Sequence, residues 1–143
     1  MSPFPQFSEA VSLALHSMVL LAQSASPLTV REMAEQTGAS FHHLAKVFQR
    51  LRKANLVVSS RGPKGGFALA RCPERITLLE VYEAIEGSVP EKICLLGAAS
   101  CPFTQCIFGG LLGEFALRFR DYLASHTLSD VCRKEADCGV LLS

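Results

Sequence analysis

A glycine-rich basic turn between two short apolar runs constrains the fold of this chain most. The segment 61–66 reads Arg-Gly-Pro-Lys-Gly-Gly. Glycine reaches backbone conformations that other residues avoid and proline presets one dihedral angle, so this composition predicts a turn. The flanking runs, 56–60 and 67–70, carry β-favouring residues such as Val57, Val58 and Phe67 and predict two strands. The sequence therefore predicts a β-hairpin with a positively charged tip.

Two short helices joined by a tight turn are predicted directly before this hairpin. Thr29, with Glu32 three residues later, forms a capping-box pattern that starts a helix through residue 36, and Gly38 ends it. The next helix is predicted over 40–55, where apolar residues recur at helical spacing: Leu44, Val47, Phe48 and Leu51. Two helices linked by a short glycine-containing turn indicate a helix-turn-helix, and the hairpin that follows makes it a winged helix.

Further helices are predicted on both sides of the winged helix. An apolar helix over 7–23 precedes it, and a second capping-box pattern at Thr77 and Glu80 starts a helix that Gly87 ends. Residues 88–106 are predicted to be irregular. After them, helical spacing of apolar residues predicts a long amphipathic helix that includes Phe108, Leu111, Leu112, Phe115, Phe119, Tyr122 and Leu123.

These elements predict a mainly α fold with a small β-hairpin: a winged helix-turn-helix plus a long dimerisation helix. We divide the chain into a winged helix-turn-helix DNA-binding domain over 1–87, a cysteine-rich loop over 88–107, and a dimerisation helix with a C-terminal tail over 108–143. Because most helix-turn-helix proteins bind two-fold symmetric sites, we expect the long helix to pair with a second copy.

Charge is concentrated in one part of a nearly neutral chain. The net charge is +1, yet residues 40–75 carry eight basic side chains and one acidic one, Glu74. Such a segment is typical of a nucleic-acid-binding surface, although a solvated face that binds nothing has the same composition. We expect the second helix of the motif in the major groove and the hairpin along the backbone or minor groove. The expected DNA-binding residues are Ser40, His42, His43, Lys46, Arg50, Arg52, Lys53, Arg61 and Lys64.

Three of the six cysteines lie close together in the irregular segment. Cys94, Cys101 and Cys106 fall within thirteen residues and can converge on one metal centre. Soft thiolates favour iron–sulfur clusters, zinc or copper(I), and the absence of a second cysteine pair at zinc-finger spacing makes structural zinc the weaker alternative. They could also be small buried apolar residues. No role is assigned to the remaining cysteines, Cys72, Cys132 and Cys138.

Several classes of protein are disfavoured. No run of 18 apolar residues is present, which argues against a membrane span. No basic residue precedes Arg31, so a secretory signal lacks its charged start and we expect a cytoplasmic protein. In that reducing compartment cysteines serve more often as ligands or redox thiols than as structural disulfides. A thiol oxidoreductase is disfavoured because the chain has no Cys-x-x-Cys motif and no predicted βαβ unit.

The motifs of the winged helix resemble a known family. Leu51-Arg52-Lys53, the turn 61–66 followed by Phe67, Ile76-Thr77-Leu78-Leu79 and the late segment 127–131 are similar to landmarks of the Rrf family of bacterial winged-helix transcription regulators. Its members include the iron–sulfur sensors IscR, NsrR and RsrR. The resemblance covers residues 7–131 and implies a homodimeric regulator of a double-stranded DNA operator, not an enzyme.

The resemblance also implies a ligand set. Cluster-binding members carry three cysteines before the dimerisation helix, which here are Cys94, Cys101 and Cys106, with six and four intervening residues in place of the five and five of IscR-like members. Where IscR-like members have a histidine, this chain has Gly109. RsrR-like members place a histidine on the first helix, and His16 matches it. Glu9, Ser12 and an exogenous group stay open as alternative fourth ligands.

The implied function is transcription regulation that senses redox state, nitric oxide or iron–sulfur status through a 2Fe-2S or 4Fe-4S cluster. The alternative is a cluster-free regulator switched by reversible disulfides among the same cysteines. Visible absorbance after anaerobic purification distinguishes these two. A winged helix that binds protein instead of DNA is a further alternative, and salt-dependent binding to duplex DNA distinguishes it from both.

Overall fold

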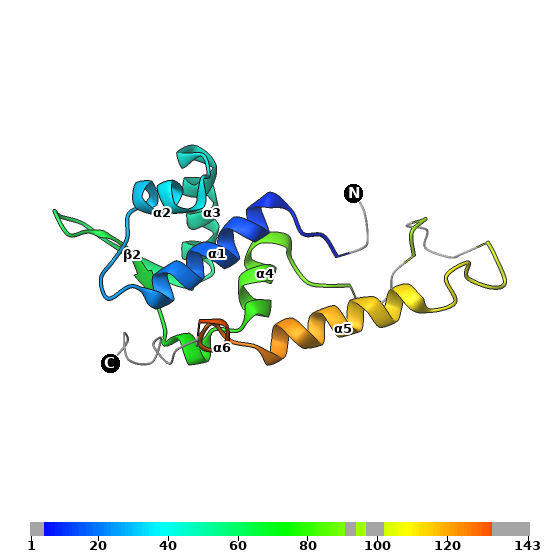
Figure 1. Ribbon diagram of the computed structural model, residues 1–143. Coiled ribbons are helices and arrows are strands. Elements are labelled where there is room, and N and C mark those ends of the chain that lie inside the picture. Colours follow the sequence, from blue (N-terminus) through cyan, green and yellow to red (C-terminus); the bar gives the residue numbers. More distant parts are fainter. Residues whose placement is uncertain (1–4, 91–93, 97–101, 133–143) are drawn as a thin grey trace.

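The computed structural model contains every predicted element in the predicted order, together with two additional short helices (Figure 1). It describes residues 5–90, 94–96 and 102–132. Mainly helical secondary structure and one two-stranded antiparallel sheet confirm the expected fold class. The elements are α1 (Glu9–Gln23), α2 (Val30–Thr37), α3 (Phe41–Lys53), β1 (Val57–Ser60), β2 (Gly66–Leu69), η1 (Pro73–Arg75), α4 (Leu78–Glu86), α5 (Leu111–Ser125) and α6 (Leu128–Val131).

Side-chain caps start the helices where the sequence predicts them. Both predicted capping boxes form, with Thr29 at the start of α2 and Thr77 at the start of α4. The Oγ atom of Ser40 accepts from the backbone N–H of His43 and caps α3. Gly38 has a φ of 75° and ends α2 in the left-handed conformation. These caps satisfy backbone groups that a helix end otherwise leaves without partners.

The core of the head, which we define as residues 5–90, forms around α1. This helix contacts α2, α3 and α4, so its apolar residues are covered on several sides, as its composition predicts. The largest fully buried side chains are Phe48, Met18, Met33, Leu44 and Leu51. Burial of such a side chain contributes about 1.5–3 kcal/mol relative to leaving it in water. The two short helices of the predicted helix-turn-helix are thereby held at a fixed angle.

The hairpin, which we call the wing, is attached to the head at its base. Its strands pair from Val57 with Leu69 to Ser60 with Gly66. Leu28, just before α2, forms an additional bridge with Phe67: the Leu28 N–H donates to the Phe67 carbonyl at 3.0 Å and the Phe67 N–H donates back at 2.7 Å. The direction of the wing is therefore set by the segment that enters α2.

Helix α5 forms an arm that extends away from the head (Figure 1). The long helix is predicted to include Phe108, but it begins at Leu111 because Gly109 and Gly110 have φ angles of 56° and 91°, which a helix does not accept. One side of α5 contacts α4, with Ala116 and Leu123 buried. The chain has no helix in its described part that is long and apolar enough to span a membrane.

The end of the arm returns to the head through α6. Thr127 caps α6 with a third capping box. The Leu128 N–H donates to the Ile76 carbonyl at 3.0 Å, and the Leu78 N–H donates to the His126 carbonyl at 2.9 Å. The short helix α6 is too brief to show apolar periodicity and is not predicted from the pattern. These bonds fix the C-terminal end of the arm beside the start of α4.

Candidate nucleic-acid interface and cysteine loop

Helix α3 has one buried face and one basic exposed face. Its buried residues are Leu44, Val47, Phe48 and Leu51. At about 3.6 residues per turn, the opposite face contains four exposed side chains, all of them hydrogen-bond donors: His42, Lys46, Gln49 and Lys53. No acidic residue occurs in α3, so no side chain of the helix neutralises the positive charge of this face. It has the composition of a surface that contacts phosphates and base edges.

Two residues predicted to contact DNA have partners within the chain. Arg50 donates from Nη1 to the backbone carbonyl of Ile85 at 3.0 Å, and Nδ1 of His43 lies 3.4 Å from Oε1 of Glu9. Both lie on the flank of α3 that faces the rest of the head, rather than on its outer face. Arg52 is exposed on the other flank, and the hydroxyl of Ser40 is used by the cap.

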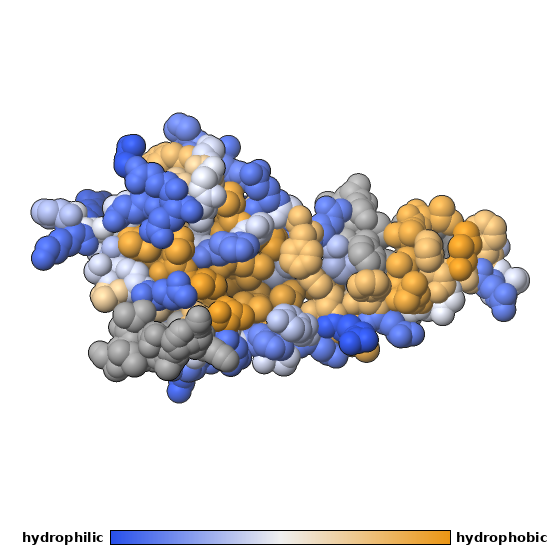
Figure 2. Space-filling model, viewed as in Figure 1, coloured by the Kyte–Doolittle hydropathy of each residue, from blue (hydrophilic) through white to orange (hydrophobic). Residues whose placement is uncertain are grey.

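The tip of the wing supplies the other expected DNA-binding side chains. Arg61 and Lys64 are exposed, and the hairpin projects beyond the body of the head (Figure 1). Figure 2 shows hydrophilic surface over α2, α3 and the wing. The wing and the outer face of α3 thus form one polar, basic end of the molecule.

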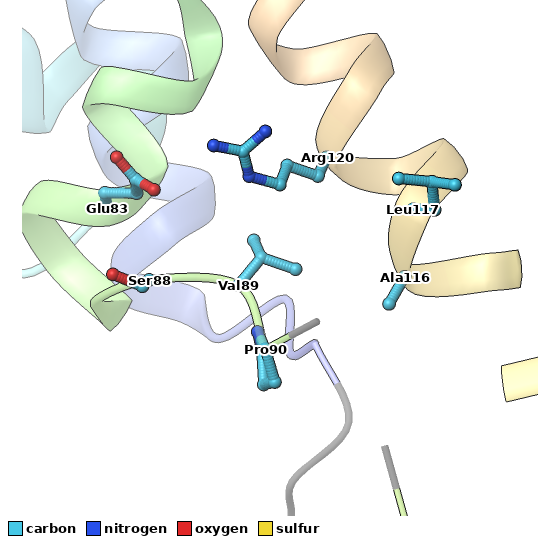
Figure 3. Close-up of a pocket in the computed structure, with 7 residues that line it drawn as sticks. All are labelled: Glu83, Ser88, Val89, Pro90, Ala116, Leu117 and Arg120. Atoms are coloured by element: carbon cyan, nitrogen blue, oxygen red, sulfur yellow. The ribbon is translucent and has the colours of Figure 1, made fainter. Parts of the chain in front are cut away.

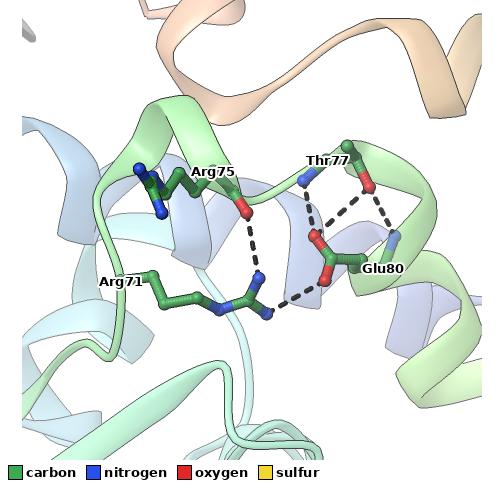
Figure 4. A network of polar contacts seen from close by, with 4 residues as sticks. All are labelled: Arg71, Arg75, Thr77 and Glu80. Atoms are coloured by element: carbon green, nitrogen blue, oxygen red, sulfur yellow. Dashed lines mark hydrogen bonds and ion pairs between the residues drawn. The ribbon is translucent and has the colours of Figure 1, made fainter.

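One arginine of the basic segment, Arg71, serves the fold instead. Arg71 donates to the Arg75 carbonyl and to Oε2 of Glu80, each at 3.0 Å (Figure 4). Glu80 also accepts from the backbone N–H of Thr77 as part of the α4 cap. Burial raises the pKa of Glu80, but the hydrogen bonds from Thr77 and Arg71 and the Arg71 charge outweigh it, so the pKa lies below its ordinary value. Part of the charge of segment 40–75 is therefore neutralised at the joint between the wing and α4.

Sequence reasoning missed one basic residue near this surface. Arg31, at the start of α2, precedes the basic segment and was not assigned to the DNA-binding surface. Its guanidinium carbon lies 5.5 Å from the centroid of the Phe41 ring, which is 43% exposed at the start of α3. An Arg on one helix and an aromatic residue ten positions later give no periodic signal, so only the angle between the helices reveals the pair.

Two residues of the cysteine loop lie near each other at the start of the arm. Cys94 and Cys106 line the same cavity of about 430 Å³, with an otherwise apolar wall formed by Leu95, Leu96, Phe103, Ile107, Phe108 and Leu112. Cys101 lies outside the described residues. Figure 2 shows hydrophobic surface at this far end of the arm. Two of the three predicted thiol ligands therefore line one hollow, whose other lining residues are apolar among those that the structure describes.

His16 lies on α1 in a different cavity, of about 650 Å³, whose other lining residues include Ser12, Gln36 and Val131. Its Nδ1 is 2.7 Å from the backbone carbonyl oxygen of Ser12. A carbonyl only accepts, so the proton of the neutral ring lies on Nδ1 and Nε2 carries the lone pair. Among the residues whose positions are described, no three histidine, cysteine or acidic side chains come together as a metal site.

A third cavity, of about 710 Å³, separates the arm from the head. Glu83 of α4 and Arg120 of α5 face each other across it, above Val89 and Pro90 (Figure 3). Arg120 is exposed, and within the described part of the chain the two charges form no ion pair. The arm and α4 are thus in contact along part of their length and apart at this point.

Comparison with known proteins identifies the relatives of this chain. Residues 7–134 match the family model Rrf2, described as an iron-dependent transcriptional regulator. The HTH-type transcriptional regulator IscR of Xenorhabdus nematophila is 32% identical over 126 residues, which is 87% of this chain and 73% of that protein.

Solved structures agree with the sequence relatives. CymR, the global cysteine regulator of B. subtilis, superposes with a TM-score of 0.75 at 26% identity, covering 88% of this chain and 95% of that one. T. potens IscR superposes with a TM-score of 0.70 at 26% identity, covering 88% and 85%. These relatives are regulators of transcription, not enzymes. The chain therefore belongs to the Rrf2 family of transcriptional regulators.

Proposed function

We propose that this regulator binds operator DNA as a homodimer and that its cysteine loop holds an iron–sulfur cluster whose state changes the affinity for DNA. The observation that carries the proposal is the shared cavity of Cys94 and Cys106 at the start of the arm. Two soft sulfur ligands in an apolar hollow suit such a cluster better than a hard cation. When bound, the cluster would supply a centre that reacts with oxidants or nitric oxide.

The proposed ligands are Cys94, Cys101, Cys106 and His16. The Nδ1–H of His16 is directed to the Ser12 carbonyl, which leaves Nε2 as the coordinating atom. Within one chain, His16 lines a different cavity from Cys94 and Cys106. We therefore assign the fourth position to His16 of the partner subunit, so that cluster binding would join the arm of one copy to the head of the other.

The proposed dimer uses the side of α5 that faces away from the head. Leu111, Phe115 and Tyr122 fall on one stripe of the helix and are 52%, 56% and 55% exposed. Phe119, also expected in this seam, instead stacks edge-on against Tyr82 and Phe7, with ring centroids 5.2 and 5.1 Å apart. Burial of the exposed stripe against a second copy would remove this apolar surface from water.

The head offers a path from the loop to the DNA-binding surface. The arm contacts α4, and α4 is tied to α3 by the hydrogen bond from Arg50 to Ile85. A shift of the arm would therefore move the outer face of α3 relative to that of a second copy. Such coupling typically changes affinity by about 5–150-fold.

A cluster-free thiol switch is the second candidate. Cys94 and Cys106 share one cavity, so reversible disulfide chemistry within the loop would also alter the start of the arm. The two candidates differ in colour and in iron content, because only the cluster absorbs visible light.

Operator binding tests the function as a whole. Duplexes selected from a random pool by the anaerobically purified protein should bind with strong salt dependence, and brief air exposure should change that affinity. The variant Cys106→Ala should lose the response to air, whereas Cys72→Ala, a change at an exposed cysteine beside the wing, should keep it. Equal responses in wild type and Cys106→Ala would contradict a role for the loop in sensing.

A further inference from the structure

A cavity of about 470 Å³ lies where the starts of α2 and α3 meet the end of the wing strands that adjoins the turn. Three separate elements supply its walls, and none of its lining residues was assigned to DNA from the sequence. The lining residues are Thr29, Val30, Arg31, Phe41, Ser59, Ser60, Gly66 and Phe67. We call this cavity the wing corner.

The backbone around the wing corner is held in place. The paired hydrogen bonds between Leu28 and Phe67 join the entry of α2 to strand β2. Gly66 has a φ of 143°, and a Cβ atom there would lie 2.5 Å from the Leu28 carbonyl oxygen. Only glycine allows so close an approach, so the start of strand β2 and the segment that enters α2 form one fixed unit.

The charge at the wing corner comes from Arg31. Its guanidinium lies beside the Phe41 ring, a cation–π arrangement that orients the planar group. The neighbouring acid, Glu32, is turned to the cap, where it accepts from the N–H and the hydroxyl of Thr29. Within the described part of the chain, neither the Arg71–Glu80 ion pair nor the contact between His43 and Glu9 includes Arg31. Its positive charge is therefore available to a ligand.

A hydroxyl group reaches the cavity from the wing. Ser59 and Ser60 end strand β1, are exposed and line the cavity, and Ser59 lies on the same face of the hairpin as its pairing partner Phe67. The Ser59 hydroxyl has no hydrogen-bond partner within the residues that the structure describes. An oriented guanidinium and an unused hydroxyl donor on one cavity match the needs of a phosphate, which accepts charge-assisted and neutral hydrogen bonds together.

We propose that the wing corner binds a backbone phosphate of the operator, with Arg31 as the contacting residue and Phe41 as the residue that positions it. The proposal rests on the function proposed above. The corner lies between the outer face of α3 and the wing tip with Arg61 and Lys64, so a duplex that touches both would pass its backbone there. A free phosphate would offer the same chemistry but not these two flanking contacts.

This contact predicts a particular energetic signature. Phosphate contacts position a protein on DNA and carry no direct sequence information. Loss of the Arg31 charge should therefore weaken binding to specific and unrelated duplexes to a similar degree, by about 5–10-fold at moderate salt. It should also reduce the slope of log Kobs against log[salt] by about 0.9, the value of one phosphate.

Fluorescence anisotropy of a labelled selected duplex, titrated over a range of salt concentrations, tests the inference. Arg31→Ala should show the smaller slope, and Arg31→Lys should restore the slope with an affinity about 2–3-fold below wild type. Phe41→Leu should keep the slope and weaken binding by a similar 2–3-fold. Arg75→Ala is the matched control: it also removes one exposed positive charge, but at η1, where only the backbone carbonyl makes a described contact.

The outcomes separate the two proposals. Absence of salt-dependent DNA binding by the wild-type protein would overturn the proposed function and this inference together. Normal wild-type binding with an unchanged slope in Arg31→Ala would overturn the phosphate contact alone. A wild-type affinity in Phe41→Leu would show that the ring does not position Arg31. Displacement of the labelled duplex by inorganic phosphate, beyond the effect of an equal ionic strength of chloride, would show that the corner binds the free ion.

Discussion

Arg50 of α3 donates a hydrogen bond of 3.0 Å to the backbone carbonyl of Ile85, in the last turn of α4. The bond satisfies one of the carbonyls that a helix end leaves without an intrahelical partner. It also connects the helix expected to lie on DNA with the helix that carries the arm. A basic residue within the DNA-binding segment thus serves the internal architecture of the head.

Replacement of Arg50 should affect stability. Arg50→Ala should lower the free energy of unfolding by about 1 kcal/mol, because a charged donor is lost and the Ile85 carbonyl must find water. Lys53→Ala, on the exposed outer face of α3, should change stability by less than about 0.5 kcal/mol and should weaken DNA binding instead. Chemical denaturation of both variants measures their free energies of unfolding. Equal stability of the two would contradict the structural role of Arg50.

The arginines of the wing and of the α4 joint should behave differently. Arg61→Ala, at the exposed wing tip, should cost about 1–3 kcal/mol of specific DNA binding. Arg71→Ala should leave the affinity near that of wild type, because Arg71 is bonded to Glu80 and to the Arg75 carbonyl. Titration of a selected duplex with each variant measures the two DNA affinities. An unchanged operator affinity in Arg61→Ala would remove the wing from the interface.

Substitutions at two phenylalanines of the arm should distinguish an effect on dimer assembly from an effect on folding. Phe115 is 56% exposed, so Phe115→Asp should give a folded monomer in sedimentation velocity experiments. Phe119 packs on Tyr82 and Phe7, so Phe119→Ala should destabilise the chain itself, by about 2–3 kcal/mol. A well-behaved dimer with Phe115→Asp would show that the seam lies elsewhere.

Stability should depend on the ionisation of Glu80. Its pKa in the folded chain lies below the ordinary value because the Thr77 and Arg71 contacts outweigh burial. The ionised carboxylate therefore stabilises the fold above the ordinary pKa of a glutamate, about 4.3, and this contribution is lost as the pH falls through the lower folded pKa.

Thermal unfolding measured across acid pH tests this dependence on Glu80. In Glu80→Gln the melting temperature should fall less steeply with decreasing pH than in wild type. Arg71→Ala should also make this fall less steep. Arg75→Ala should keep the wild-type profile, because only its backbone carbonyl takes part in the network (Figure 4). A wild-type profile in Glu80→Gln would exclude Glu80 as the group that titrates.

The sequence predicts those parts of the fold that depend on local signals. Both capping boxes, the αL glycine at Gly38 and the apolar spacing of α3 are properties of neighbouring residues, so the helix-turn-helix and the wing could be predicted. The start of α5 could not, because apolar spacing continues through Phe108 while the φ angles of Gly109 and Gly110 break the helix.

The assignment of side chains within the site depends on tertiary packing, which the charge pattern does not encode. Arg50, Arg71 and Lys53 look alike in sequence, yet Arg50 and Arg71 donate hydrogen bonds within the head, and Lys53 donates none to the residues that the structure describes. The pair Arg31 and Phe41 joins two helices at an angle that only the fold sets. Cys94 and Cys106 line one cavity, and their joint role as ligands with Cys101 stays a prediction.

The most direct test of the cluster proposal is the iron and acid-labile sulfide content of protein purified without oxygen, read together with its visible absorbance spectrum. Wild type and Cys72→Ala should both be coloured, and the iron and sulfide contents of the two proteins should be the same. Cys106→Ala should lose the colour, the iron and the sulfide. His16→Ala should keep a cluster with an altered spectrum, because one of four ligands is replaced. A colourless wild-type protein, with no more iron or sulfide than Cys106→Ala after anaerobic reconstitution, would contradict the cluster and favour a thiol switch.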